Sequence, residues 1–75
     1  MSSVVEIYVS LLDEGVRVWR PVQAERLHDG VYRIAAQPYD RTTESWEFEP
    51  GDIVMCATVE SADGPILAAI RRATK

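Results

Sequence analysis

Four glycines divide the sequence into short segments, and each of them stands in a cluster of turn-forming residues. The clusters are Asp13-Glu14-Gly15, His28-Asp29-Gly30, Pro50-Gly51-Asp52 and Asp63-Gly64-Pro65. Glycine beside aspartate is typical of the tight turns that join hairpin strands, because glycine has no Cβ to oppose a positive φ. Turns at this spacing favour many short strands over long helices, so the sequence predicts an all-β fold.

The segments between the turns alternate apolar and polar residues, as strands with one buried face do. The clearest alternation covers residues 5–11. We expect further strands at 16–27, 31–36, 46–48 and 53–59, the first of them bent where Pro21 interrupts it. Residues 66–70 fit a helix or a strand, and the turn before them favours a strand paired with 53–59. Residues 37–45 are expected to form the longest loop.

Five or six short antiparallel strands usually curl into a barrel, because closure reduces the number of exposed strand edges. We therefore expect a single domain over residues 1–75, a small, partly open SH3-like barrel with a basic C-terminal tail at 71–75. An OB-like barrel and a barrel with a C-terminal helix are the alternatives. The OB fold commonly carries a helix before its fourth strand, and the loop with Pro38, Thr42 and Thr43 does not look like one.

Three segments resemble short bacterial proteins of an uncharacterised family. They are Val18-Trp19-Arg20-Pro21-Val22, Asp29-Gly30-Val31-Tyr32-Arg33-Ile34 and Trp46-Glu47-Phe48-Glu49-Pro50-Gly51-Asp52-Ile53-Val54. Pro-Gly-Asp followed by two aliphatic residues also resembles the start of a strand in many SH3-like barrels. The resemblance implies this kind of fold and a bacterial origin. It implies no activity, so no functional role is transferred to any residue.

Charge and residue content argue against several classes of function. The net charge is −4, and without Arg71, Arg72 and Lys75 the chain has five basic residues against twelve acids. Such an acidic body opposes binding to nucleic acid. One cysteine and one histidine allow neither an internal disulfide nor a four-ligand zinc site, and no cofactor is expected. The chain shows no signal peptide and no apolar run of membrane length, so we expect a cytoplasmic protein without a membrane partner.

No combination of residues in the sequence predicts catalysis, so we expect a protein that is not an enzyme. His28 is expected in a surface turn, and Cys56, among apolar neighbours, is expected to be a buried structural thiol. A domain of this size can hardly enclose a substrate between two carboxylates. We therefore expect a solvated rim, rather than a hydrolytic site, from Asp40, Glu44, Glu47, Glu49 and Asp52.

Aromatic and arginine side chains form the candidate binding surface. Trp46 and Phe48 share one phase and are expected in the core, whereas Trp19 is out of phase with its apolar neighbours and should be the most exposed aromatic, followed by Tyr39. Arginines on neighbouring strands are expected near Trp19, where they bind a partner or pair across strands with Glu6, Glu25 or Glu47. The candidate residues are Trp19, Arg17, Arg20, Arg33 and Tyr39.

These features favour a non-catalytic protein-binding or assembly module. A chain this short has a thin core, and neither disulfide nor metal supplements it, so self-association into a homodimer is expected. Adjacent apolar pairs, which leave apolar surface outside the barrel, point the same way: Val4 with Val5, Ile53 with Val54, and Ile66 with Leu67. The alternatives are an acidic inhibitor or immunity-type protein that blocks a basic site, and a nucleic-acid-binding small barrel, which the charge disfavours.

Overall fold

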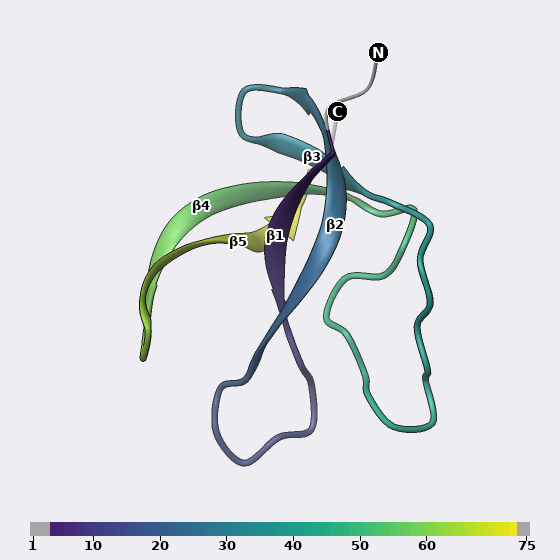
Figure 1. Ribbon diagram of the computed structural model, residues 1–75, viewed down its shortest axis with the longest axis vertical. Coiled ribbons are helices and arrows are strands. Elements are labelled where there is room, and N and C mark those ends of the chain that lie inside the picture. The colour runs from purple at the N-terminus through teal and green to yellow at the C-terminus, as the bar shows by residue number, and fades with distance from the viewer. Residues whose placement is uncertain (1–3, 74–75) are drawn as a thin grey trace.

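The computed structural model describes residues 4–73, and these fold into five strands without a helix. The strands are β1 (Val4–Ser10), β2 (Trp19–His28), β3 (Val31–Ile34), β4 (Ile53–Ser61) and β5 (Gly64–Arg72). Each strand pairs with the next, and β5 returns to β1, so the sheet closes into a small barrel (Figure 1). The predicted all-β fold is confirmed, and the segment 66–70 is a strand. Residues 4–73 contain no helix that could cross a membrane.

The barrel closes through β1 and β5, which pair in parallel at Tyr8 and Ala68. All the other pairs are antiparallel. In a meander with an odd number of strands the first and the last run in the same direction, so this pair departs from the expected antiparallel set. The small barrel of five strands is therefore confirmed, and it is consistent with the expected SH3-like barrel and with the OB-like alternative.

β2 begins at Trp19 and not at residue 16, because residues 12–17 form an exposed loop that contains a positive φ of 63° at Asp13. Pro21 is tolerated inside β2 because the ladder to β3 begins only at Ala24. Two residues further along β2, at Gln23, the side-chain amide of Gln37 makes hydrogen bonds of the kind that a neighbouring strand would make. Gln23 N donates to Gln37 Oε1 at 3.0 Å, and Gln37 Nε2 donates to Gln23 O at 2.9 Å.

The expected strand at 46–48 is wrong, since the structure has only an isolated bridge between Leu11 and Trp46. The backbone of this segment hydrogen-bonds to the end of β1, where Glu47 N donates to Ser10 O at 2.9 Å. The alternation nevertheless holds, because Trp46 and Phe48 are 4% and 6% exposed and belong to the core, as predicted. β3 likewise ends at Ile34, before the expected residue 36.

The centre of the core is formed by aliphatic residues from four strands, which are Ile7, Val9, Val22, Ile34 and Val54. The expected apolar surface outside the barrel is also present, at Val4, Val5 and Ile53. The expected basic tail is wrong for Arg71 and Arg72, because both belong to β5 and pair with β4. Residues 74–75 of that tail lie outside the described residues.

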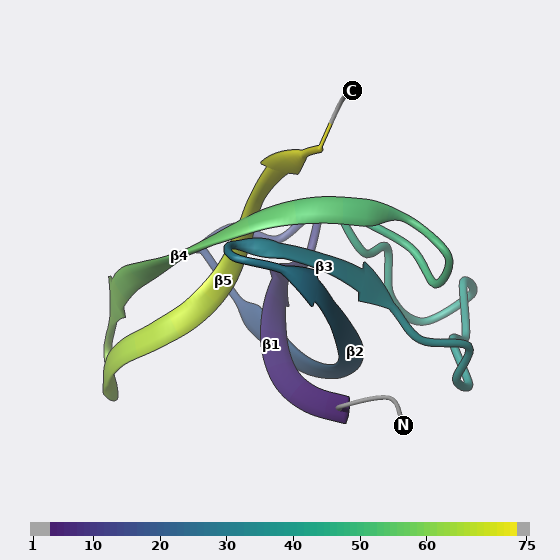
Figure 2. The ribbon, with the colours of Figure 1, turned by 90° about the horizontal axis from the view of Figure 1, so that it is seen from above.

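The hairpin of β4 and β5 extends beyond the rest of the barrel. β4 pairs with β3 only over Ile53–Met55, whereas it pairs with β5 from Val54 to Ser61. Residues 57–67 therefore form a two-stranded extension, which we call the β4–β5 ribbon; it projects from the barrel in both ribbon views (Figures 1 and 2). The ribbon ends in a tight turn at Gly64, whose φ is +109°.

Candidate functional site

A groove lies between the β1–β2 hairpin and the β4–β5 ribbon. It consists of two adjoining hollows of about 420 and 340 Å³ that share Arg17, Trp19 and Glu60. We call it the Trp19 groove and define it by Tyr8, Arg17, Trp19, Glu47, Glu60 and Asp63. Within residues 4–73 no group of three or more His, Cys, Asp or Glu side chains is placed to hold a metal ion.

The floor of the Trp19 groove follows from the register of β1 and β2. Tyr8 stands opposite Pro21, and Ser10 stands opposite Trp19. Directly opposed residues share a face, and residues two apart in a strand share a face, so Tyr8 and Trp19 lie together on the outer side of the hairpin. Both are partly exposed, whereas their neighbour Val9 points inward and is buried.

Arg17 lies over the ring of Trp19, with its guanidinium carbon 5.0 Å from the ring centroid. This is a cation–π contact at an exposed site, of the kind worth about 0.5–1 kcal/mol. The carboxylates of Glu47, Glu60 and Asp63, by contrast, make no ion pair or hydrogen bond with the described residues. The groove therefore contains three carboxylates and one guanidinium.

The other two arginines expected near Trp19 do not line the groove, so that expectation is wrong for both. Arg33 pairs across strands with Glu25 at 2.6 Å, and Glu25 is one of the cross-strand partners that the sequence analysis named. Arg20 Nε lies 3.6 Å from Glu44 Oε1. Glu44 also accepts a hydrogen bond from the indole Nε1 of Trp46 at 2.9 Å, so Arg20 supports the packing of a core residue.

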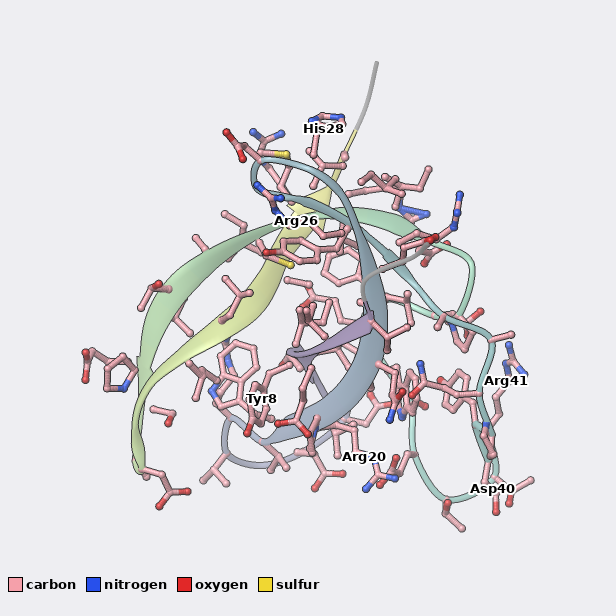
Figure 3. All side chains as sticks on the ribbon, turned by 45° about the horizontal axis from the view of Figure 1, so that its top comes forward. Tyr8, Arg20, Arg26, His28, Asp40 and Arg41 are labelled. Atoms are coloured by element: carbon pink, nitrogen blue, oxygen red, sulfur yellow. The ribbon has the colours of Figure 1, made fainter. Side chains whose placement is uncertain are left out.

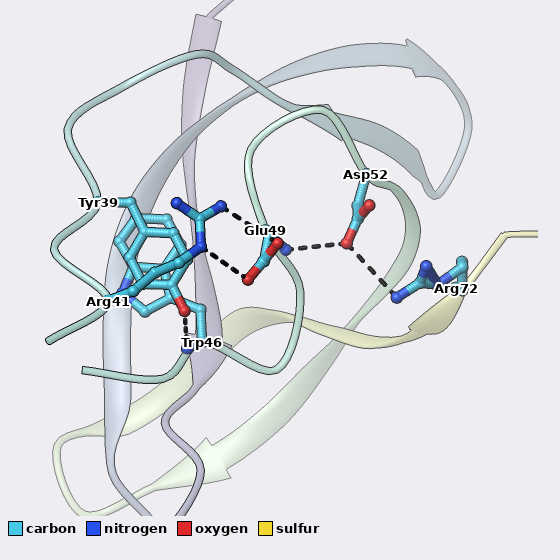
Figure 4. A network of polar contacts seen from close by, with 6 residues as sticks. All are labelled: Tyr39, Arg41, Trp46, Glu49, Asp52 and Arg72. Atoms are coloured by element: carbon cyan, nitrogen blue, oxygen red, sulfur yellow. Dashed lines mark hydrogen bonds and ion pairs between the residues drawn. The ribbon is translucent and has the colours of Figure 1, made fainter.

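Tyr39 braces the long loop and is less exposed than the sequence predicts. Its ring stacks on Trp46 with centroids 4.3 Å apart, and its hydroxyl accepts a hydrogen bond from Trp46 N at 2.7 Å (Figure 4). Arg41 covers the tyrosine ring at 4.5 Å and pairs with Glu49 at 3.3 Å. The hydrogen bond with Glu49 raises the pKa of Arg41. Tyr39 is therefore fixed within the loop.

Most of the acidic residues expected on the rim hold the loop in shape. Asp40 accepts hydrogen bonds from the hydroxyl and backbone N of Thr42 at 2.5 and 2.9 Å, and these bonds lower the pKa of Asp40. Asp52 accepts from Glu49 N at 2.9 Å and lies 3.5 Å from Arg72 (Figure 4). Of the five rim acids, Glu47 is the one that lines the Trp19 groove.

Cys56 is buried, and burial raises the pKa of its thiol to about 11. The thiol is therefore neutral near pH 7 and a poor nucleophile, as expected for a structural cysteine.

A third hollow, of about 540 Å³, lies at the end of the barrel where the β2–β3 hairpin turns. We call it the apolar end and define it by Leu27, Val31, Ile53, Met55 and Ala73. Leu27 and Ile53 are 37% and 38% exposed. The exposed His28 and Asp29 also line this hollow, and His28 lies well away from Tyr8 (Figure 3).

Sequence reasoning missed Tyr8, Glu60 and Asp63 as members of the groove. Tyr8 gave a usable signal, because it occupies the outward phase of the alternation in residues 5–11. The two acids gave none, because their place beside Trp19 depends on how far the β4–β5 ribbon extends.

Comparison of the chain with protein-family models, curated proteins and solved structures found no match. The resemblance to an uncharacterised bacterial family therefore stays a prediction.

Proposed function

We propose that this chain is a non-catalytic protein-binding module of the bacterial cytoplasm and that the Trp19 groove is its binding surface. The observation that carries the proposal is the contrast between the two tryptophans, because Trp46 is buried and Trp19 is partly exposed in a groove. Tryptophan and tyrosine are enriched among the residues that dominate binding energy at protein interfaces. An acidic surface suits a protein partner better than nucleic acid or an anionic membrane.

The test compares Trp19→Ala with Val16→Ala. Val16 lies in the loop before β2, is 75% exposed and does not line the groove, so it controls for the loss of exposed apolar surface. The wild-type chain is used to capture partners from the cytoplasm of its host, and the captured protein is then purified and titrated. We expect Trp19→Ala to weaken its affinity at least about tenfold, as loss of an interface anchor does, with Val16→Ala unchanged. Equal affinities for the two variants would refute the proposal.

Self-association is a second candidate, and the apolar end supports it. Leu27 and Ile53 are exposed and line one hollow together with Met55, which gives an exposed apolar patch beside the polar His28 and Asp29. Such patches usually mark interaction sites in stable proteins, and a two-fold dimer is the commonest way to cover one. The acidic body opposes the association, but salt screens surface repulsion beyond about 8–10 Å.

Sedimentation equilibrium at micromolar concentration tests the dimer. We expect twice the 8.4 kDa mass of the chain. Ile53→Lys should return the protein to a monomer, because it places a charge in the covered surface. Val16→Lys adds the same charge at an exposed valine away from the apolar end and should remain a dimer. A single species at the monomer mass for the wild-type chain would discard this candidate.

A further inference from the structure

The chemistry of the Trp19 groove points to the kind of side chain that it takes from a partner; this inference rests on the proposed protein-binding function. The floor is aromatic, with Trp19 and Tyr8 on the same face of the β1–β2 hairpin. The face of an indole is the best aromatic surface for a cation. Arg17 already demonstrates the fit, since its guanidinium lies 5.0 Å from the centroid of the Trp19 ring.

The sides of the groove contain three acidic residues beside the apolar Val59, Ile66 and Ile70. Glu60 lies next to the end of β4, Asp63 stands in the β4–β5 turn, and Glu47 comes from the loop that meets the end of β1. These three carboxylates are without a partner among the described residues. Among the other acids in residues 4–73, five lie within ion-pair distance of an arginine (Glu25, Asp29, Glu44, Glu49 and Asp52), and four form no ion pair (Glu6, Asp13, Glu14 and Asp40).

We propose that the Trp19 groove binds an arginine side chain of a protein partner and that Arg17 occupies this position in the free protein. The three carboxylates line two adjoining hollows and lie beyond ion-pair distance of Arg17, but they outnumber its one guanidinium, so the groove is negatively charged and complementary to a second cation. Arginine suits the site better than lysine, because its planar guanidinium stacks on an aromatic ring while its N–H groups bind carboxylates in pairs. Arg17 is itself exposed, so an arriving arginine can displace it.

The probe is the blocked peptide Gly-Gly-Arg-Gly-Gly, compared with the same peptide carrying citrulline in place of arginine. Citrulline keeps the shape of arginine but replaces the guanidinium with a neutral urea. The readout is the indole N–H resonance of Trp19 in the ¹⁵N-labelled protein, with the buried indole of Trp46 as an internal reference. We expect the Trp19 resonance to shift and saturate with the arginine peptide, at an affinity at least about tenfold above that for citrulline.

Three variants distinguish specific recognition from general charge attraction. Arg17→Ala is expected to bind the arginine peptide several times more tightly, because the internal competitor and its positive charge are removed. The double variant Glu60→Gln, Asp63→Asn should bind it about tenfold more weakly, as expected when charge-assisted bonds become neutral ones. Asp29→Asn removes the same kind of charge from the β2–β3 turn, outside the groove, and should leave the affinity unchanged.

The outcomes separate this inference from the proposed function. Equal shifts with the arginine and citrulline peptides, or no shift with either, would overturn arginine recognition. A captured partner that still depends on Trp19 would then leave the groove as a binding surface of another kind. Weaker binding by Arg17→Ala would also overturn the inference, because it would make Arg17 a contact residue and not an internal competitor.

Discussion

Replacing Trp46 with alanine is expected to lower the free energy of unfolding by about 3–5 kcal/mol, the usual cost of truncating a buried large aromatic. The side chain is 4% exposed, stacks on Tyr39 and donates its indole N–H to Glu44. All three contributions disappear with the indole ring. A chain of 75 residues has a total stability of about 4–11 kcal/mol, so this variant should be close to unfolding at room temperature.

Trp19→Ala is the matched comparison, because it removes the same side chain from a partly exposed position. We expect it to cost about 1 kcal/mol, near the centre of the range for single substitutions. Urea midpoints followed by far-UV circular dichroism avoid the loss of tryptophan fluorescence in either variant. Trp46→Phe retains an aromatic ring, so we expect it to stay folded and to lose less stability than Trp46→Ala. A loss for Trp19→Ala equal to that for Trp46→Ala would contradict the assignment of Trp46 to the core.

The sequence predicted the strands and the core because both follow from local patterns. Alternation with period 2 places inward residues wherever the chain is extended, and this holds for Trp46 and Phe48 even though their segment forms only one bridge. The turns at Gly30, Gly51 and Gly64 have positive φ, which the Asp-Gly and Pro-Gly pairs indicate directly. The hairpin turn at Gly64 also favoured a strand over a helix for residues 66–70, and the structure confirms the strand.

The partners of the polar side chains were not predictable in the same way. The positions of Arg20 and Arg33 on their strands do not specify which acid lies within reach. Arg20, for example, pairs with Glu44, which lies in a loop. The Trp19 groove exists because β4 is nine residues long and β3 only four, so that the β4–β5 ribbon extends beyond the barrel. This difference in strand length depends on which strands pair across the sheet, and the alternation and turn patterns in the sequence do not contain that information.

The second large effect is expected at Gly64, where replacement by alanine should destabilise the protein by about 1–3 kcal/mol through backbone strain. Gly64 has a φ of +109°, a conformation that L-residues rarely adopt. A Cβ added there meets nothing within 4 Å, so steric contact contributes nothing to the cost. The turn is also fixed by a hydrogen bond that Ser61 Oγ donates to Gly64 O at 2.7 Å. A change in the backbone angles of residue 64 would disturb this bond.

Gly15→Ala isolates this strain, because an added Cβ at Gly15 also meets nothing within 4 Å and its φ lies outside the positive range. Alanine there restricts the unfolded chain and should leave stability unchanged or raise it by up to about 1 kcal/mol.

A synthetic chain with D-alanine at position 64 gives the sharpest comparison, since a D-residue adopts positive φ without strain. We expect urea midpoints to fall for L-alanine at Gly64 and to stay at or above the wild-type value for D-alanine. Equal midpoints for the two enantiomers would show that the turn relaxes to another conformation when glycine is lost. The position of Asp63 in the Trp19 groove would then not depend on Gly64.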